Sequence, residues 1–370
     1  MHFKIQKNLL DKTLEIVSKY TDPINAYYAL RCVLIKITDE KIYLIASNGT
    51  QSIQKELEVD EKYIEIYEEG IFLIQAQIFK NSIKKLSGLI DIKLVNNTNL
   101  EITEGFTNYS LTTIDVETFL PIDFEYTGKT IEIPSEQFKK GIKDVEKVVS
   151  SDMQIIYKCI NLKIEDNKMI FGATDTYRLA YETFWLKNKN QEIKNFDFSL
   201  ENNYFKDLLP SDVPSSFQLY YDNLKIGIIY KNTKIISRFV DMEFYNLTKV
   251  IPTNFKYKIT INKAELMNLI DKVAVVTNEK QNRIEVKITN KEFELKTFVK
   301  EIGTSIAKTN KFKLDEGSSL EFDLNFVFLK DAINVFEGDI TLNIDEKISK
   351  ILILSEKDPN LIQLITPKRR

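Results

Sequence analysis

The sequence predicts an α+β protein built from three copies of one structural unit. Three short alternating strands open the units at residues 3–5, 131–133 and 259–261, and they are evenly spaced along the chain. Farther on, each unit has a predicted β-hairpin, in which a polar turn joins two strands, at 34–46, 161–173 and 285–297. Two features that recur in the same order at near-constant spacing indicate an internal repeat.

An amphipathic helix follows each opening strand, and a second helix is expected later in each unit, at about 76–87, 199–209 and 325–336. Strand segments outnumber helices throughout, which favours α+β over an alternating α/β fold. We expect the apolar stripes of the first helices to pack on a sheet. These stripes are Leu9, Leu10, Leu14, Ile16 and Val17; Phe138, Ile142, Val145, Val148 and Val149; and Leu266, Leu269, Ile270 and Val273.

The repeat predicts three domains in the 370 residues, at 1–128, 129–254 and 255–370. The first boundary falls in the polar stretch Thr127-Gly128-Lys129. The second falls near Pro252-Thr253-Asn254.

Composition is ordinary for a soluble globular protein, with 43% hydrophobic and 28% charged residues. The only cysteines, Cys32 and Cys159, are far apart and form neither a disulfide framework nor a C-x-x-C site. The first seven residues lack the apolar stretch of a signal peptide, and no segment has the apolar length of a membrane span. We therefore expect a cytoplasmic protein.

The net charge of −3 argues against a conventional basic DNA-binding domain. On the predicted helices, however, lysines outnumber acidic residues, so the rest of the chain is acidic. A solvated helix face is the usual explanation of such a bias. Combined with the repeat, it suggests a basic inner surface for a polyanion, with sequence-independent phosphate contacts.

Catalytic groups are scarce. The single histidine, His2, is expected to be an exposed residue at a strand end, and no triad or zinc site can be built around it. No G-x-G-x-x-G motif occurs among the eleven glycines. We therefore expect no enzyme, no cofactor and no metal site, with a carboxylate-metal hydrolase as a remote alternative.

Four segments from residue 173 onward carry distinctive motifs. Residues 173–180 read A-T-D-T-Y-R-L-A. They are followed by S-R-F-V-D at 237–241 with Phe244 and V-I-P at 250–252, by T-N-E-K at 277–280, and by I-T-P-K-R at 365–369. The first resembles the motif A-T-D-(G/S)-(H/Y)-R-L-A of one family, the bacterial DNA polymerase III β subunits or β sliding clamps, and the others resemble further motifs of that family in the same order.

The resemblance implies a DNA clamp fold, in which each domain has two helices on the inner face and β-sheets outside. Each chain would be half of a ring, and a head-to-tail homodimer would enclose duplex DNA as a processivity factor. The lysines that would then face DNA are Lys12, Lys80, Lys84, Lys85, Lys139, Lys143 and Lys206. At the subunit contact, Tyr109 and Leu111 would meet Val275 and Val276 of a second copy.

The resemblance also implies a surface groove for a short hydrophobic peptide of partner proteins. These partners would be the DNA polymerase III catalytic subunit, the clamp loader and other replication and repair proteins with a clamp motif. The groove would comprise Tyr157, Thr174, Tyr177, Arg178, Leu179, Tyr245, Lys249, Val250, Leu364, Thr366, Pro367 and Lys368.

Two groove residues depart from the family pattern. Tyr245 stands where proline is usual, and Thr366 where methionine or leucine is usual, so the peptide preference is expected to shift. Arg178 either contacts the peptide or forms an ion pair with Asp175 that holds a turn. A three-repeat scaffold that does not load onto DNA remains the main alternative function.

Overall fold

The computed structural model describes residues 1–60, 62–126, 130–151, 153–186, 195–222, 224–277 and 282–369. They form two compact units: unit 1 is Met1–Ser135 with Lys206–Phe239, and unit 2 is Glu136–Phe205 with Val240–Arg370. Residues 127–129 of the first predicted boundary, residues 278–280 of one motif, and Arg370 lie outside the described residues. Both domain boundaries, after residues 128 and 254, remain predictions.

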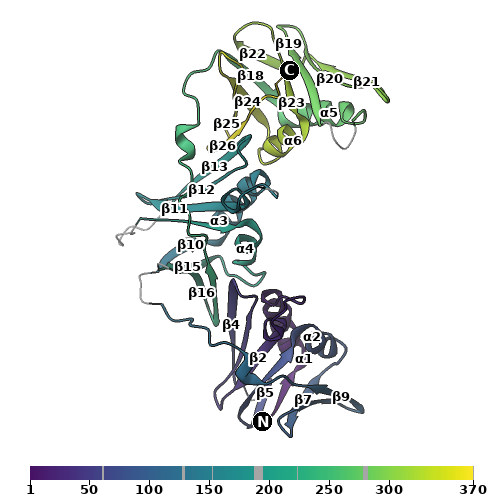
Figure 1. The fold of residues 1–370 in the computed structure, drawn as a ribbon, viewed down its shortest axis with the longest axis vertical. Coiled ribbons are helices and arrows are strands. Elements are labelled where there is room, and N and C mark those ends of the chain that lie inside the picture. Colours follow the sequence, from purple (N-terminus) through teal and green to yellow (C-terminus); the bar gives the residue numbers. More distant parts are fainter. Residues whose placement is uncertain are drawn as a thin grey trace. The chain divides into compact units, whose positions relative to one another are not determined.

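Unit 1 has two antiparallel sheets (Figure 1). The five-stranded sheet has the order β5 (Ile64–Glu68), β1 (His2–Gln6), β7 (Leu89–Val95), β8 (Asn99–Glu104), β9 (Thr107–Thr112). The eight-stranded sheet has the order β10 (Ile131–Pro134), β15 (Ser216–Tyr221), β16 (Lys225–Tyr230), β17 (Thr233–Arg238), β4 (Gln51–Glu58), β3 (Lys41–Ser47), β2 (Cys32–Ile37), β6 (Gly70–Gln75).

Unit 2 also has two antiparallel sheets. The nine-stranded sheet has the order β14 (Phe196–Glu201), β11 (Cys159–Glu165), β12 (Lys168–Thr174), β13 (Arg178–Trp185), β26 (Asp358–Ile365), β25 (Ile351–Ser355), β24 (Asp339–Ile344), β18 (Tyr257–Asn262), β22 (Phe312–Glu316). The four-stranded sheet has the order β21 (Gly303–Thr309), β20 (Phe293–Val299), β19 (Arg283–Ile288), β23 (Leu320–Asn325).

Helices lie against these sheets, and none that the structure describes is long and apolar enough to cross a membrane. The α-helices are α1 (Lys7–Val17), α2 (Ala76–Lys84), α3 (Ser135–Val145), α4 (Asn202–Asp207), α5 (Lys263–Val273) and α6 (Phe326–Asn334). Short 3-10 helices are η1 (Ser18–Tyr20), η2 (Tyr28–Arg31), η3 (Val116–Thr118), η4 (Glu146–Val148), η5 (Ile155–Lys158) and η6 (Leu247–Lys249).

The predicted repeat is confirmed. Each opening strand leads directly into a helix (β1–α1, β10–α3, β18–α5), and the predicted hairpins are β2–β3, β11–β12 and β19–β20. The middle repeat contributes strands to both units, because β10 and β15–β17 join the eight-stranded sheet while β11–β14 join the nine-stranded one.

Burial follows the periodicities from which the elements were predicted. Strand β18 alternates between buried and more exposed residues, and Leu266, Leu269, Ile270 and Val273 of α5 are all buried against it and its neighbours. The Asn262 side chain accepts a hydrogen bond from the backbone N–H of Ala264 at 3.0 Å and so caps the start of α5.

Two expectations were wrong. The helix expected at 199–209 is only six residues long, α4, because residues up to Glu201 extend β14 and pair with β11, with Glu201 opposite Cys159. Tertiary strand pairing thus outweighs local helix preference there. His2 is half-buried rather than exposed, and its Nε2 lies 2.7 Å from Asp91 Oδ1 on the neighbouring strand β7.

Candidate functional site

The turn between β12 and β13 presents Tyr177 to solvent. The Asp175 Oδ1 atom accepts hydrogen bonds from the backbone N–H groups of Tyr177 (3.0 Å) and Arg178 (2.9 Å). Thr174 Oγ1 accepts one from the Thr176 N–H (3.1 Å), and Thr176 adopts a φ of +74°. These local bonds hold the backbone while the Tyr177 side chain stays 60% exposed.

Arg178 is held by two carboxylates and an aromatic ring. Its Nε donates to Asp175 Oδ2 at 2.8 Å, and its Nη1 donates to Asp331 Oδ2 at 2.7 Å. The guanidinium also lies 4.2 Å from the ring centre of Phe328. The ion pair with Asp175 is therefore present, and Arg178 connects the turn to α6 besides.

The C-terminal strand continues the sheet beside this turn. In the antiparallel pair of β13 and β26, Arg178 lies opposite Ile365 and Leu179 opposite Leu364. Beyond β26, the Thr366 N–H donates to the Tyr177 carbonyl at 2.9 Å, and the Lys368 N–H donates to the Asp323 carbonyl at 2.8 Å. The last described residues are thereby held between the β12–β13 turn and strand β23 of unit 2.

A cavity of about 770 Å³ opens between the turn, α6 and the C-terminal segment. Four residues predicted for the groove line it: Tyr177, Thr366, Pro367 and Lys368. The sequence reasoning missed five others: Asn325, Phe328, Ile348, Ser349 and Arg369. Phe328 could have been predicted from the sequence. It is a large aromatic residue of α6 that lies outside the buried stripe of Leu329, Ala332 and Ile333.

A second part of the predicted groove is an apolar cluster. Leu179 and Leu364 are buried with Leu247 and Leu352, and Phe244 packs against them. Gly172 on β12 allows this approach, because a Cβ there would meet the Leu247 side chain at 2.8 Å. Leu179 is only 2% exposed, so it forms the floor of the cluster rather than an open wall.

The remaining predicted groove residues lie around the linker that follows the middle repeat. The rings of Tyr157 and Tyr245 stack at 5.4 Å, and their hydroxyls are 2.9 Å apart. Lys249 and Val250 are exposed, and the Val250 carbonyl accepts a hydrogen bond of 2.6 Å from Lys350 Nζ. Lys350 directly follows Ser349, which lines the cavity, so the linker and the cavity are close in space.

Of the residues predicted for the subunit contact, Val275 is exposed, whereas Tyr109, Leu111 and Val276 are half-buried. Tyr109 and Leu111 belong to β9, an edge strand of unit 1, and Val275, 79% exposed, follows the end of α5 in unit 2 with Val276 beside it. The sequence reasoning missed three exposed apolar residues nearby: Phe106 in the β8–β9 turn, Ile302 before β21, and Ile306 on the edge strand β21, which contacts α5.

The predicted DNA-facing lysines lie on the helices. In unit 1, α1 and α2 pack together; Lys12 of α1 and Lys84 of α2 are exposed, as is Lys85 just after α2, whereas Lys80 is half-buried. Lys139 and Lys143 of α3 and Lys206 of α4 are exposed too.

One group of acidic residues could hold a metal ion within the part of the chain that the structure describes. It comprises Asp144, Glu182 and Asp358. Lys140 Nζ already lies 2.6 Å from Asp144 Oδ2, 2.6 Å from Asp358 Oδ2 and 3.4 Å from Glu182 Oε2. The ammonium group thus stands where a cation would bind.

Comparison with known proteins adds independent evidence. Three family models match in order: the DNA polymerase III beta subunit N-terminal domain (residues 1–123), central domain (132–246) and C-terminal domain (248–369). A beta sliding clamp of Mycoplasmopsis pulmonis is 29% identical over 378 residues, covering 100% of both chains. A beta sliding clamp of Bacillus subtilis is 24% identical, again over 100% of both.

Solved structures agree on the fold. The DNA polymerase sliding clamp from Bacillus subtilis superposes with a TM-score of 0.93 at 23% identity, covering 100% of this chain and 99% of that one. These matches confirm the predicted three-domain clamp fold. Since the three family models together match nearly the whole length, the chain belongs to the DNA polymerase III beta subunit family, the bacterial beta sliding clamps.

Proposed function

We propose that this DNA sliding clamp closes a ring with a second copy of itself around duplex DNA and tethers its partners through the groove of unit 2. The partners would be the DNA polymerase III catalytic subunit, the clamp loader and other proteins that carry a short hydrophobic clamp motif. The observation that carries this proposal is the groove. It joins the β12–β13 turn, the linker near Val250 and the C-terminal segment, which are far apart in sequence.

The chemistry of the groove suits a peptide with apolar anchors. Tyr177, Phe328 and Pro367 provide apolar walls beside the buried leucine cluster, and Arg178 is neutralised by its two aspartates. Each fully buried apolar side chain of a peptide contributes about 1.5–3 kcal/mol. Part of this is offset by ordering the peptide, so micromolar affinity is the expected scale.

The subunit contact would join two sheet edges. Both β9 and β21 are edge strands. Ile306 on β21 and Phe106 in the turn before β9 are exposed apolar residues, and such residues at a sheet edge invite pairing with another chain. A head-to-tail contact of this kind closes into a ring when its rotation permits. The ring would hold DNA by topology, with exposed lysines such as Lys84 and Lys85 making phosphate contacts.

A location in the cytoplasm is consistent with the cysteines. Cys32 and Cys159 are both free and buried. Burial raises the pKa of Cys32 to about 11 and the pKa of Cys159 to about 12, so neither thiol is poised as a nucleophile.

The groove is tested with a fluorescent peptide of the Q-L-x-L-F type. We expect Tyr177→Ala, and separately deletion of residues 366–370, to weaken binding at least tenfold, about 1.4 kcal/mol, by fluorescence anisotropy. Tyr67→Ala in unit 1, which removes a similarly exposed ring (52% against 60%), is the matched control. A charged residue at Leu179 would be a poor probe, because burying a charge there threatens folding. Undiminished affinity in both groove variants would mean that the groove is not the partner site.

Ring closure is tested on circular DNA with a clamp loader. We expect the loaded clamp to be retained on a closed circle and lost when the DNA is linearised. Replacing Lys80, Lys84 and Lys85 by Glu should weaken retention and lower the salt slope by about 0.9 for each lost phosphate contact. Normal loading of this triple variant would exclude α2 from the DNA surface. Loss on closed circles, with peptide binding intact, would instead favour a clamp-like scaffold that does not load.

A further inference from the structure

The turn between β3 and β4 in unit 1 repeats the groove turn of unit 2. The Asn48 Oδ1 atom accepts hydrogen bonds from the N–H groups of Thr50 (3.0 Å) and Gln51 (2.8 Å). In unit 2, Asp175 Oδ1 accepts from the N–H groups of Tyr177 and Arg178, which are likewise two and three residues farther along the chain. Ser47 Oγ accepts from the Gly49 N–H at 3.1 Å, the distance of the corresponding bond in unit 2. Gly49 has a positive φ of 93°. Thr50 therefore corresponds to Tyr177.

The strand beside this turn is also equivalent. In unit 1, β4 pairs with β17 and places Gln51 opposite Ser237; in unit 2, β13 pairs with β26 and places Arg178 opposite Ile365. In both units, the residue that follows Ser237 or Ile365 donates its backbone N–H to a carbonyl of the turn. Arg238 donates to the Thr50 carbonyl at 3.0 Å, and Thr366 donates to the Tyr177 carbonyl at 2.9 Å.

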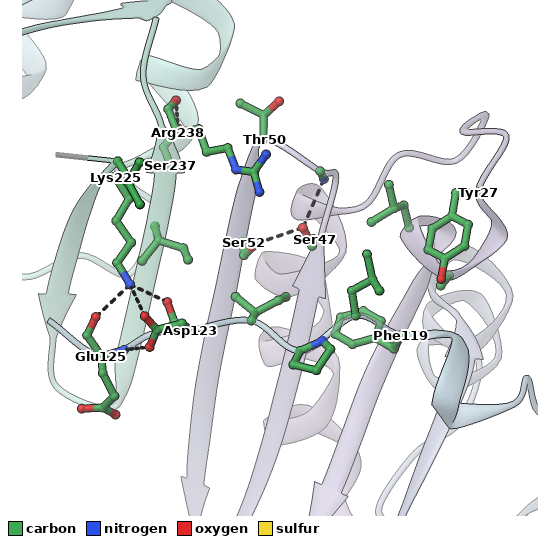
Figure 2. Close-up of a pocket in the computed structure, with 18 of the residues that line it drawn as sticks. Tyr27, Ser47, Thr50, Ser52, Phe119, Asp123, Glu125, Lys225, Ser237 and Arg238 are labelled. Atoms are coloured by element: carbon green, nitrogen blue, oxygen red, sulfur yellow. Dashed lines mark hydrogen bonds and ion pairs between the residues drawn. The ribbon is translucent and has the colours of Figure 1, made fainter. Parts of the chain in front are cut away.

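A linker completes the correspondence and leaves a second cavity. Phe119 is buried with Ala29, Cys32 and Leu73, while the next residue, Leu120, is 66% exposed. The same succession occurs at Phe244 and the exposed Tyr245. A cavity of about 650 Å³ lies between the turn, this linker and the end of β17, and Figure 2 shows its lining.

The lining combines apolar side chains with two basic ones, Lys225 and Arg238, which lie opposite each other in the β16–β17 pair. Leu30, Leu120 and Leu224 provide apolar surface, and Leu224 is 79% exposed. Arg238 reaches toward Thr50 in Figure 2, and it forms no ion pair with any residue that the structure describes. Its cross-strand neighbour Lys225, by contrast, is fully engaged through Nζ with Asp123 Oδ2 (2.9 Å) and the carbonyls of Asp123 and Glu125.

We propose that this cavity is a second peptide-binding site, and that it takes a partner segment with a bulky apolar side chain next to a carboxylate. The apolar side chain would cover Leu120 and Leu224, and the carboxylate would pair with Arg238. A uniformly acidic peptide is disfavoured, because Asp123 and Glu125 line the same cavity beside Lys225 and are 74% and 82% exposed as side chains.

The second site would select a different sequence from the groove. Thr50 and Ser52 stand where Tyr177 and Leu179 stand in unit 2, so the equivalent position has more room for an aromatic anchor. Arg238 occupies the position in unit 1 that Thr366 occupies in unit 2, and its positive charge adds a preference for a carboxylate next to the apolar anchor. A clamp with two such sites could hold two segments of one partner, or two partners, at once. Because the groove is its template, the inference rests on the proposed function.

The test uses the full chain with the groove variant Tyr177→Ala as background. Two fluorescent probes share a Leu-Phe core, one with an adjoining Glu and one with an adjoining Lys. We expect the Glu probe to bind at least tenfold more tightly, the scale of a hydrogen bond to a charged group, and Arg238→Glu to reverse the preference. Lys93→Glu, a charge reversal at an exposed lysine away from the cavity, should leave the preference unchanged.

A photoreactive leucine in the Glu probe then maps the site by mass spectrometry. Crosslinks at 119–122 or at Leu224 support the proposal. Crosslinks only at 174–179, 245–250 or 364–369, or a preference that Arg238→Glu does not reverse, overturn it. The Q-L-x-L-F probe on the unaltered chain reports on the groove separately, so failure of the second site is distinguishable from failure of the proposed function.

Discussion

Glu182 lies in a cluster where three carboxylates share one ammonium group, and this arrangement predicts a stability that depends on pH. Lys140 makes its closest contacts with Asp144 and Asp358, both at 2.6 Å, and Glu182 is farther away at 3.4 Å. The Glu182 side chain is 1% exposed, whereas that of Asp358 is 25% exposed. Burial, together with the charges of Asp358 and Asp144, raises the pKa of Glu182 from 4.5 to about 8.

The direction of the effect follows from this raised pKa. In the folded chain Glu182 holds its proton up to about pH 8, whereas in the unfolded chain it loses it near pH 4.5. Its contribution to stability is therefore fully present below pH 4.5 and is lost as the pH rises through 8. The separation of the two pKa values sets an upper bound of roughly 5 kcal/mol. We expect about 2–3 kcal/mol, because water reaches the cluster beside Asp358.

Glu182→Gln removes the titrating group and keeps its shape. The variant should match the parent chain near pH 5 and become about 2–3 kcal/mol more stable than it near pH 8.5. Chemical unfolding at fixed protein concentration measures this, followed by the fluorescence of the single tryptophan, Trp185, on the same strand. Glu165→Gln, which breaks a surface pair with Lys163 at 2.7 Å, is the control and should change stability by less than about 1 kcal/mol. A stability difference between Glu182→Gln and the parent that does not grow with pH would refute the reasoning.

Three further predictions concern the subunit contact, the groove turn and Tyr245. Replacing Val275 and Val276 by Asp should yield monomers by light scattering, because burying a charge at an apolar contact is unfavourable. An unchanged dimer would show that these two residues are not at the subunit contact. Thr176→Gly should raise the free energy of unfolding by about 1 kcal/mol, since a β-branched residue at φ +74° is strained and Gly49 occupies the equivalent position in unit 1. Urea unfolding that shows no gain would contradict it. Tyr245→Pro, which removes the stack on Tyr157, should change the ranking of clamp peptides by anisotropy more than it changes stability; the opposite result would show that Tyr245 is structural.

Local periodicity was sufficient to predict the repeated elements from sequence. A strand such as β1 alternates every second residue and α5 buries one stripe, so their patterns are visible over a few residues without knowledge of the fold. The groove turn was also local, because Asp175 bonds to backbone groups two and three residues away. The family motif at 173–180 lies across this turn, which is why resemblance located it.

Tertiary structure decided what depends on strands and side chains that are distant in sequence. The pairing of β13 with β26 and of β4 with β17 brings together residues nearly two hundred positions apart, and no local pattern encodes such a pairing. Only that pairing buries Leu179, places Phe328 beside Arg178, and leaves Arg238 over a cavity that resembles the groove. Sequence therefore determined the elements and the family, whereas long-range pairing determined which side chains remain open to a partner.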